Sequence, residues 1–343
     1  MRIITNHKFW AFVGRFSLVY VLTYTAAAVI FLTIQNALPA PGRVALDFFQ
    51  PYALGVREIA AQVLVGGVIA LVLYPFYDTI VKEKSGWLVL FAALWGVALL
   101  GSLEPKPGSF EGMLYLEAGW TEHLLVLAAG ALQTLLFCRL FLPWERRQKA
   151  EEWAEERARK RTEKKAGAGP KRQISAAKLI RGYVGRFTFL HVVIYILVGA
   201  AFYQISGYEE ALATMEEFAL WRDLENIVMP FVILFGQVFR GGILALLLYP
   251  FYPTYLDKRH GWLLLFGLLF GLKVMVIAIS IPASFQEFIL ALETSKTGLP
   301  EIIAQTLLFS GVFFAWERRK MKKAGKEEVK IEGKEVSSPA AGN

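Results

Sequence analysis

Eight apolar runs dominate this sequence, and each is long enough to cross a lipid bilayer. They cover residues 16–34, 60–77, 87–103, 124–142, 187–205, 227–252, 262–281 and 299–316. The hydrocarbon core of a bilayer takes about 20 residues of helix. Backbone groups in lipid must bond within the protein, and the runs lack the period-two alternation of barrel strands. We therefore predict an all-α integral membrane protein with eight transmembrane helices.

The chain also repeats itself, and the repeat predicts how the eight helices are grouped. Residues 62–87 read QVLVGGVIALVLYPFYDTIVKEKSGW, and residues 237–262 read QVFRGGILALLLYPFYPTYLDKRHGW. These segments share 14 of 26 positions at an offset of 175. Shorter matches, VGRF, QTLLF and WERR, follow in the same order in both halves. We interpret the chain as two tandem copies of a four-helix unit.

The repeat gives the expected domain organisation. The first four-helix repeat covers residues 1–144, a charged cytoplasmic linker helix 145–175, the second repeat 176–319, and a disordered cytoplasmic tail 320–343. Because each copy has an even number of spans, both copies begin on the same side of the membrane. The repeats are therefore expected to be parallel, related by an axis along the membrane normal.

The uneven distribution of charge predicts the orientation. The side with both termini and the linker carries 29 Lys and Arg against 14 Asp and Glu, whereas the other side carries 5 against 14. By the positive-inside rule the basic side is cytoplasmic, so we expect a multi-pass protein of the cell membrane with both termini in the cytoplasm. Short amphipathic helices at 44–50 and 208–225 are expected along the outer interface.

The expected partners follow from these features. Membrane lipids surround the spans, and anionic headgroups suit the basic cytoplasmic face, where Arg15 and Arg186 begin their spans. No nucleic acid is expected, and the sequence does not fix the oligomeric state. The single cysteine, Cys138, excludes a disulfide within the chain. Phosphate-loop, HExxH and GxSxG motifs are absent, so we expect no cofactor and no metal, and assign no catalytic residue.

Charged residues deep inside the spans are the informative candidates for a site. Arg240 lies 12 residues before Tyr252, and Lys273 lies 11 residues after Trp262, so both are about 16–18 Å from the cytoplasmic end of their spans. Glu301 lies nearer the outer side. Their counterparts in the first copy are uncharged, whereas both copies keep the glutamines. We predict a ligand-binding site at Arg240, Lys273, Glu301, Gln237 and Gln305.

Two interpretations of these charges stay open. Glu301 pairs with Arg240 or Lys273 and ties helices together, or the surplus positive charge binds an anion. A second polar set on the outer side includes Glu111, Glu117, Glu122 and His123. Glu122 and His123 offer two metal-ligand types, but a lone histidine with scattered carboxylates is weak evidence for a metal site.

The function favoured by this pattern is transport or binding of an anionic small molecule or lipid at a mid-membrane site in the second repeat. Duplicated bundles place such sites near the midplane. Two alternatives remain: a membrane enzyme that acts on a lipid or isoprenoid, with Glu301 or Glu111 as acid or base, and a non-catalytic scaffold subunit of a membrane complex that docks through the basic linker.

Overall fold

The computed structural model describes residues 7–39, 56–102, 105–164, 176–205, 221–223, 226–272 and 299–323. Every named element in these ranges is a helix. Six helices are long and apolar enough to cross a membrane, namely His7–Ala37, Ile59–Phe76, Trp120–Ala150, Leu179–Ile205, Met229–Asp257 and Leu299–Lys323. The prediction of an all-α, multi-pass membrane protein is confirmed at this level.

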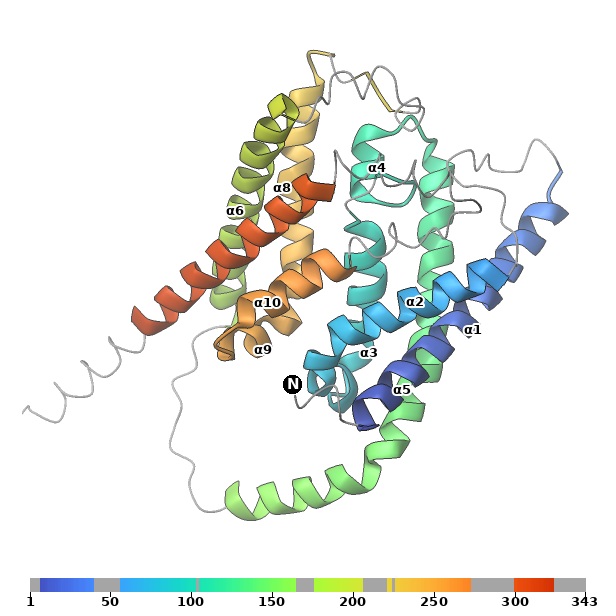
Figure 1. Cartoon of the computed structure of the whole chain (residues 1–343), viewed down its shortest axis with the longest axis vertical. Coiled ribbons are helices and arrows are strands. Elements are labelled where there is room, and N and C mark those ends of the chain that lie inside the picture. Colours follow the sequence, from blue (N-terminus) through green and yellow to red (C-terminus); the bar gives the residue numbers. More distant parts are fainter. Residues whose placement is uncertain are drawn as a thin grey trace, which may run out of the picture.

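The described helices are distributed over both copies of the sequence repeat (Figure 1). The first repeat contains α1 (His7–Ala37), α2 (Val56–Leu73), η2 (Tyr74–Phe76), η3 (Asp78–Lys82), α3 (Gly86–Phe91), η4 (Ala92–Leu100), α4 (Phe110–Tyr115) and α5 (Trp120–Lys164). The second contains α6 (Ala176–Ile205), α8 (Met229–Leu248), η6 (Tyr249–Phe251), α9 (Tyr252–Asp257), α10 (Gly261–Phe266), η7 (Gly267–Gly271) and the C-terminal helix (Leu299–Lys323).

The third apolar run of the first repeat is shorter than the others. In the first repeat it forms the apolar helix Gly86–Leu100, made of α3 and the π-helical η4. Its 15 residues span about 22 Å at the rise of an α-helix, less than the roughly 30 Å of a bilayer core. Its counterpart, Gly261–Gly271, is described only in its first part, because residues 273–298 lie outside the described ranges.

Four other sequence predictions fall wholly or partly outside the described residues. The expected outer helix at 44–50 is not described, and of that at 208–225 only residues 221–223 are. The first part of the linker is helical and continuous with the fourth span, because α5 runs through Pro143 to Lys164. The C-terminal helix continues to Lys323, four residues into the predicted tail, and residues 324–343 are not described.

Aromatic side chains fill the core of each repeat at equivalent positions. In the first repeat α1 packs against α2 and α5, and in the second α6 packs against α8 (Figure 1). Edge-on rings join α1 to α5 and α6 to the C-terminal helix. Stacked rings lie along α5 and along the C-terminal helix. The buried rings are Phe12, Phe16, Phe137 and Phe141 in the first repeat, and Tyr183, Phe187, Phe309 and Phe313 in the second.

A carboxylate clasp joins helices at the same end of each sequence repeat. Arg15 donates two hydrogen bonds to Glu145, at 2.7 and 2.9 Å, and the Tyr77 hydroxyl donates a third at 3.0 Å. The equivalent residues Arg186, Glu317 and Tyr252 make the same contacts. The two arginines, expected to face lipid headgroups, therefore bind the glutamate of the WERR motif instead. Burial and the Glu145 carboxylate raise the pKa of the Tyr77 phenol, so it stays a donor.

Removing the charge of one clasp should destabilise the fold measurably. Glu145→Gln is expected to lower the free energy of unfolding by about 1.5–3 kcal/mol, because two charge-assisted bonds to a buried carboxylate are weakened. The measurement is unfolding in mixed dodecyl maltoside and SDS micelles. Glu83→Gln, at an exposed position, is the matched control and should change stability little. Equal stabilities of the two variants would contradict a structural role for the clasp.

Candidate functional site

The short third helix of the first repeat ends among other helices and leaves backbone carbonyls to be bonded. After η4, the chain continues through Gly101 and Ser102, and these residues are buried, as are residues 107–112. Irregular backbone at membrane depth is stable only where protein or water supplies partners. The last carbonyls of a helix also carry partial negative charge, which favours a cation beside them.

Arg240 on α8 supplies these hydrogen bonds. Its Nη2 donates to the carbonyl oxygens of Gly101 and Ser102, at 3.3 and 3.2 Å. Its Nη1 pairs with the carboxylate of Glu111 on α4 and also donates to Oε1 of Gln237, at 3.2 Å. Arg240 and Gln237 are fully buried and Glu111 is 3% exposed. One residue of the second repeat is thus bound by three residues of the first.

One donor of this guanidinium remains unused. The Nε atom of Arg240 is buried and has no hydrogen-bond partner among the described residues. Gln237 completes the cluster by donating from Nε2 to both oxygens of Glu111, at 3.3 and 3.5 Å. Glu111 is the only charged group that pairs with Arg240 in the described part of the chain. It therefore provides the counter-charge that a buried guanidinium requires.

The ion pair occurs in only one of the two places where the sequence repeat would allow it. At the offset of 175, Arg240 corresponds to Val65 and Glu111 corresponds to Gln286. The equivalent pair, Val65 and Gln286, therefore carries neither charge. This is expected if each buried charge requires the other. The shared four-helix scaffold is compatible with an uncharged pair, so the charges are a specific addition to it.

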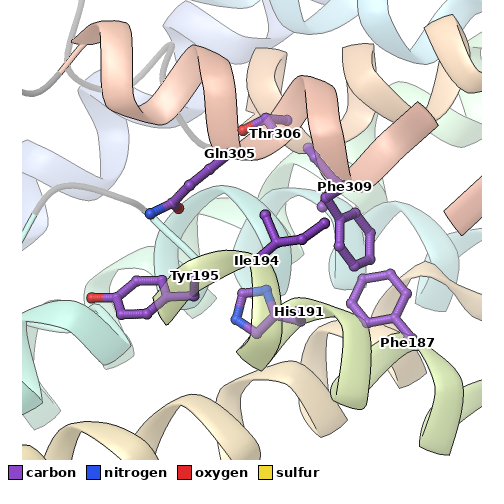
Figure 2. A pocket seen from close by; sticks show the side chains of 8 residues that line it. Phe187, His191, Ile194, Tyr195, Gln305, Thr306 and Phe309 are labelled. Carbon is purple, nitrogen blue, oxygen red and sulfur yellow. The ribbon is translucent and has the colours of Figure 1, made fainter. Parts of the chain in front are cut away.

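A small polar cavity lies next to the cluster, between α6 and the C-terminal helix. It has a volume of about 30 Å³. Figure 2 shows side chains from the two helices facing one another across it. Its polar lining comes from His191, Tyr195, Gln305 and Thr306. A polar cavity of this size holds one or two water molecules, and is too small for an organic anion.

His191 connects the cavity to the ion pair. Its Nε2 lies 3.2 Å from Oε1 of Gln237, the oxygen that also accepts from Arg240. Since an amide oxygen only accepts, Nε2 of His191 carries the proton in this contact. A hydrogen-bonded chain thus runs from the cavity through His191 and Gln237 to Arg240 and Glu111. His191 is therefore a packed, hydrogen-bonded residue.

The short helix α4 is held against the second repeat at both ends. At its start, Ser109 accepts a hydrogen bond from the backbone N–H of Gly112 and caps the helix, and Glu111 reaches Arg240. At its end, the hydroxyls of Tyr115 and Tyr195 lie 2.6 Å apart. Because Tyr195 also lines the cavity, α4 contacts the cavity lining directly at one end and through the cluster at the other.

The structure groups the predicted site residues into two sets. Arg240 and Gln237 are bonded to each other, and Gln305 donates to Glu301 at 3.0 Å. The sets approach each other at the cavity, which His191 and Gln305 both line. Lys273 lies outside the described residues. The sequence interpretation sought the partner of Arg240 in Glu301, whereas the structure supplies Glu111.

Glu111 is the residue that sequence reasoning missed as part of the site. Glu111 was expected in the outer polar set, or as the acid or base of a membrane enzyme, and not as the partner of Arg240. The repeat contained the missing signal: a comparison of acidic positions between copies pairs Glu111 with Gln286, just as the comparison of cations pairs Arg240 with Val65. The positions equivalent to Arg240 and Glu111 both lack a charge, and this joint absence of opposite charges indicates that the two residues pair.

The outer polar set does not form a metal-ligand cluster in the described part of the chain. No group of three or more His, Cys, Asp or Glu side chains is close enough to hold a metal ion there. Nδ1 of His123 accepts a hydrogen bond from the backbone N–H of Gly108, at 3.0 Å. This nitrogen is therefore engaged in holding the loop at Gly108, where φ is +85°.

Comparison with known proteins gives no match: no family model, no curated protein and no solved structure resembles the chain. Function must therefore be argued from the site itself.

Proposed function

We propose that this chain is a transport protein of the cell membrane, with eight membrane-crossing segments in two parallel four-helix repeats and both termini in the cytoplasm. The ordered sequence repeat, the matched clasps of the two repeats and the basic charge of one side support this arrangement. In the third segment of the first repeat, the short helix Gly86–Leu100 and the buried chain after it together complete the crossing.

The site of transport in this proposal is the cluster around Arg240, which binds an anionic small molecule or the anionic headgroup of a lipid. The observation that carries it is a guanidinium with no exposed surface that bonds a carboxylate from the other repeat. Carboxylate and phosphate groups match the planar fork of arginine. Glu111 therefore shows what kind of group the pocket accepts.

An anion reaches Arg240 in this proposal by taking the place of Glu111. The guanidinium is completely enclosed, and the neighbouring cavity has room only for water. Binding therefore requires α4 to move away from α8. Glu111 bonds the start of α4 to Arg240, whereas the end of α4 is held by the Tyr195 hydroxyl and by Arg222, which donates to the carbonyl oxygens of Tyr115 and Leu116. A ligand that replaces Glu111 therefore frees the start of the element from its charged bond while the end stays held.

Ligand-dependent thermal stability tests this proposal. The full chain in dodecyl maltoside is unfolded by heating in the presence of inorganic phosphate, succinate or phosphatidylglycerol. Binding at 100 times Kd adds about 2.7 kcal/mol of stability, which raises Tm by several degrees. Phosphate or succinate alone indicates a free anion, whereas an effect of phosphatidylglycerol alone indicates a lipid headgroup.

Two arginine variants show whether the effect belongs to the cluster. Arg240→Gln should abolish the increase in Tm, whereas Arg139→Gln, which changes an exposed arginine on α5, should keep it. The proposal fails if none of the three probes stabilises the wild type, or if Arg139→Gln and Arg240→Gln respond alike.

A further inference from the structure

From the geometry of the Arg240 cluster we infer that anion binding is coupled to the uptake of one proton by Glu111. The inference rests on the proposed function and extends it to the mode of coupling. The carboxylate and the ligand compete for the same guanidinium, so binding of one releases the other. What happens to the released carboxylate then determines the coupling.

A carboxylate displaced from Arg240 has no other cation beside it in the described structure. Its remaining polar neighbours are Gln237, Tyr115 and Tyr195, which are neutral. An ionised carboxylate is strongly disfavoured in such surroundings, and the neutral acid is the stable form. The proton is taken from solvent and bonds to a carboxylate oxygen of Glu111, so no other bond forms or breaks.

The groups around Glu111 provide both the charges that matter and a path for the proton. Arg240 faces it from α8, and Tyr195 and the His191–Gln237 pair face it from α6 and α8. Tyr115 lies on α4 itself, and Glu301 on the C-terminal helix interacts electrostatically with Tyr115. The cavity lined by His191, Tyr195 and Gln305 has room for water molecules that link these groups.

The balance of charge makes this coupling specific. A monovalent anion adds one negative charge and the proton adds one positive charge, so the cluster is neutral before and after binding. Without the proton, binding would leave an uncompensated negative charge in the bundle, which is disfavoured at membrane depth. The coupled step therefore allows an anion to enter the site at no net change in buried charge.

Proton uptake on binding is the direct test. Succinate, or inorganic phosphate if that is the probe that stabilises the wild type, is added to the full chain in weakly buffered detergent solution, and the pH change is read with an indicator dye. The wild type should take up one more proton per bound anion than Glu111→Gln, in which the amide imitates the neutral acid. For each pH unit, the Kd of the wild type should rise about tenfold more than that of Glu111→Gln, in which only the ionisation of the probe itself changes with pH.

A second prediction for Glu111→Gln has the opposite sign from the effect of a variant that merely damages the fold. The variant lacks the counter-charge of Arg240, so the anion should raise its Tm more than that of the wild type. Infrared difference spectra of the wild type provide a test that needs no variant. Anion binding should produce the C=O band of a protonated carboxylic acid. Glu301→Gln, the matched carboxylate control, should keep that band.

The outcomes separate this inference from the proposed function. If an anion stabilises the wild type through Arg240 but no proton is taken up and no acid band forms, the site stands and the coupling is wrong. If proton uptake persists in Glu111→Gln, the coupling group is a different residue and the inference is also wrong. If no probe binds, both fall together.

Discussion

Replacing Glu111 by alanine is expected to destabilise the protein by about 3–5 kcal/mol, because it leaves the charge of Arg240 buried without a partner. The loss should be large since Arg240 has no exposed surface through which to reach water. The measurement is again unfolding in mixed dodecyl maltoside and SDS micelles, with the wild type alongside. Glu117→Ala, an exposed acid of the same outer set, is the control and should cost little.

The sequence repeat suggests the variant that should reverse this loss. Glu111→Gln combined with Arg240→Val installs the uncharged pair found at the equivalent positions, Gln286 and Val65. The double variant should be more stable than Glu111→Ala, because no charge remains buried alone, although the carbonyls of Gly101 and Ser102 lose their donor. Additive losses for the two single changes would show that the residues do not act as a pair.

Glycine-to-alanine changes at two repeated motifs should have opposite effects on stability. Gly86 and Gly261 precede the tryptophan of the GW motif, and a Cβ at either would lie 1.8 or 1.5 Å from a backbone carbonyl oxygen, of Ile80 or Tyr255. Backbone cannot yield as a side chain does, so each alanine should cost about 1–3 kcal/mol. The same unfolding assay measures it.

The glycines of the VGRF motif are the matched comparison. A Cβ at Gly14 or Gly185 meets nothing within 4 Å, and both residues lie inside helices α1 and α6. Alanine there should stabilise the protein by about 0.5–1 kcal/mol, because glycine loses more backbone entropy in a helix. If all four variants changed stability in the same direction, close packing at the GW turns would not be the reason for those glycines.

Patterns of hydrophobicity predicted the fold class well, but not the course of the third span. Runs such as 16–34 and 187–205 must be helices in lipid, and the structure has them. The run 87–103 ended early because η4 stops at Leu100, where Arg240 bonds the two carbonyls that follow. When the end of a span depends on hydrogen bonds from a side chain of another helix, the hydropathy of the span itself does not show where it ends.

The candidate site was predicted in part for a similar reason. Arg240 and Gln237 could be found because a charge inside an apolar run is conspicuous. Glu111 lies at the start of α4, directly after a proline-containing loop, where a carboxylate is not unusual in the sequence, and only the tertiary fold brings α4 into the bundle. The role of Arg15 was misjudged likewise, because Glu145 lies 130 residues away in sequence.

The contact between Arg240 and Glu111 also determines how the membrane potential acts on this protein. One elementary charge that crosses the whole potential gains or loses about 2.3 kcal/mol per 100 mV. Movements that carry the two residues together displace no net charge and are electrically silent. Separation of the two residues does displace charge through the field. When Arg240 carries an anion and Glu111 carries a proton, each residue is neutral, and their separation displaces no charge either. On the coupling that we infer, the loaded cluster would respond to gradients of acid and anion rather than to voltage.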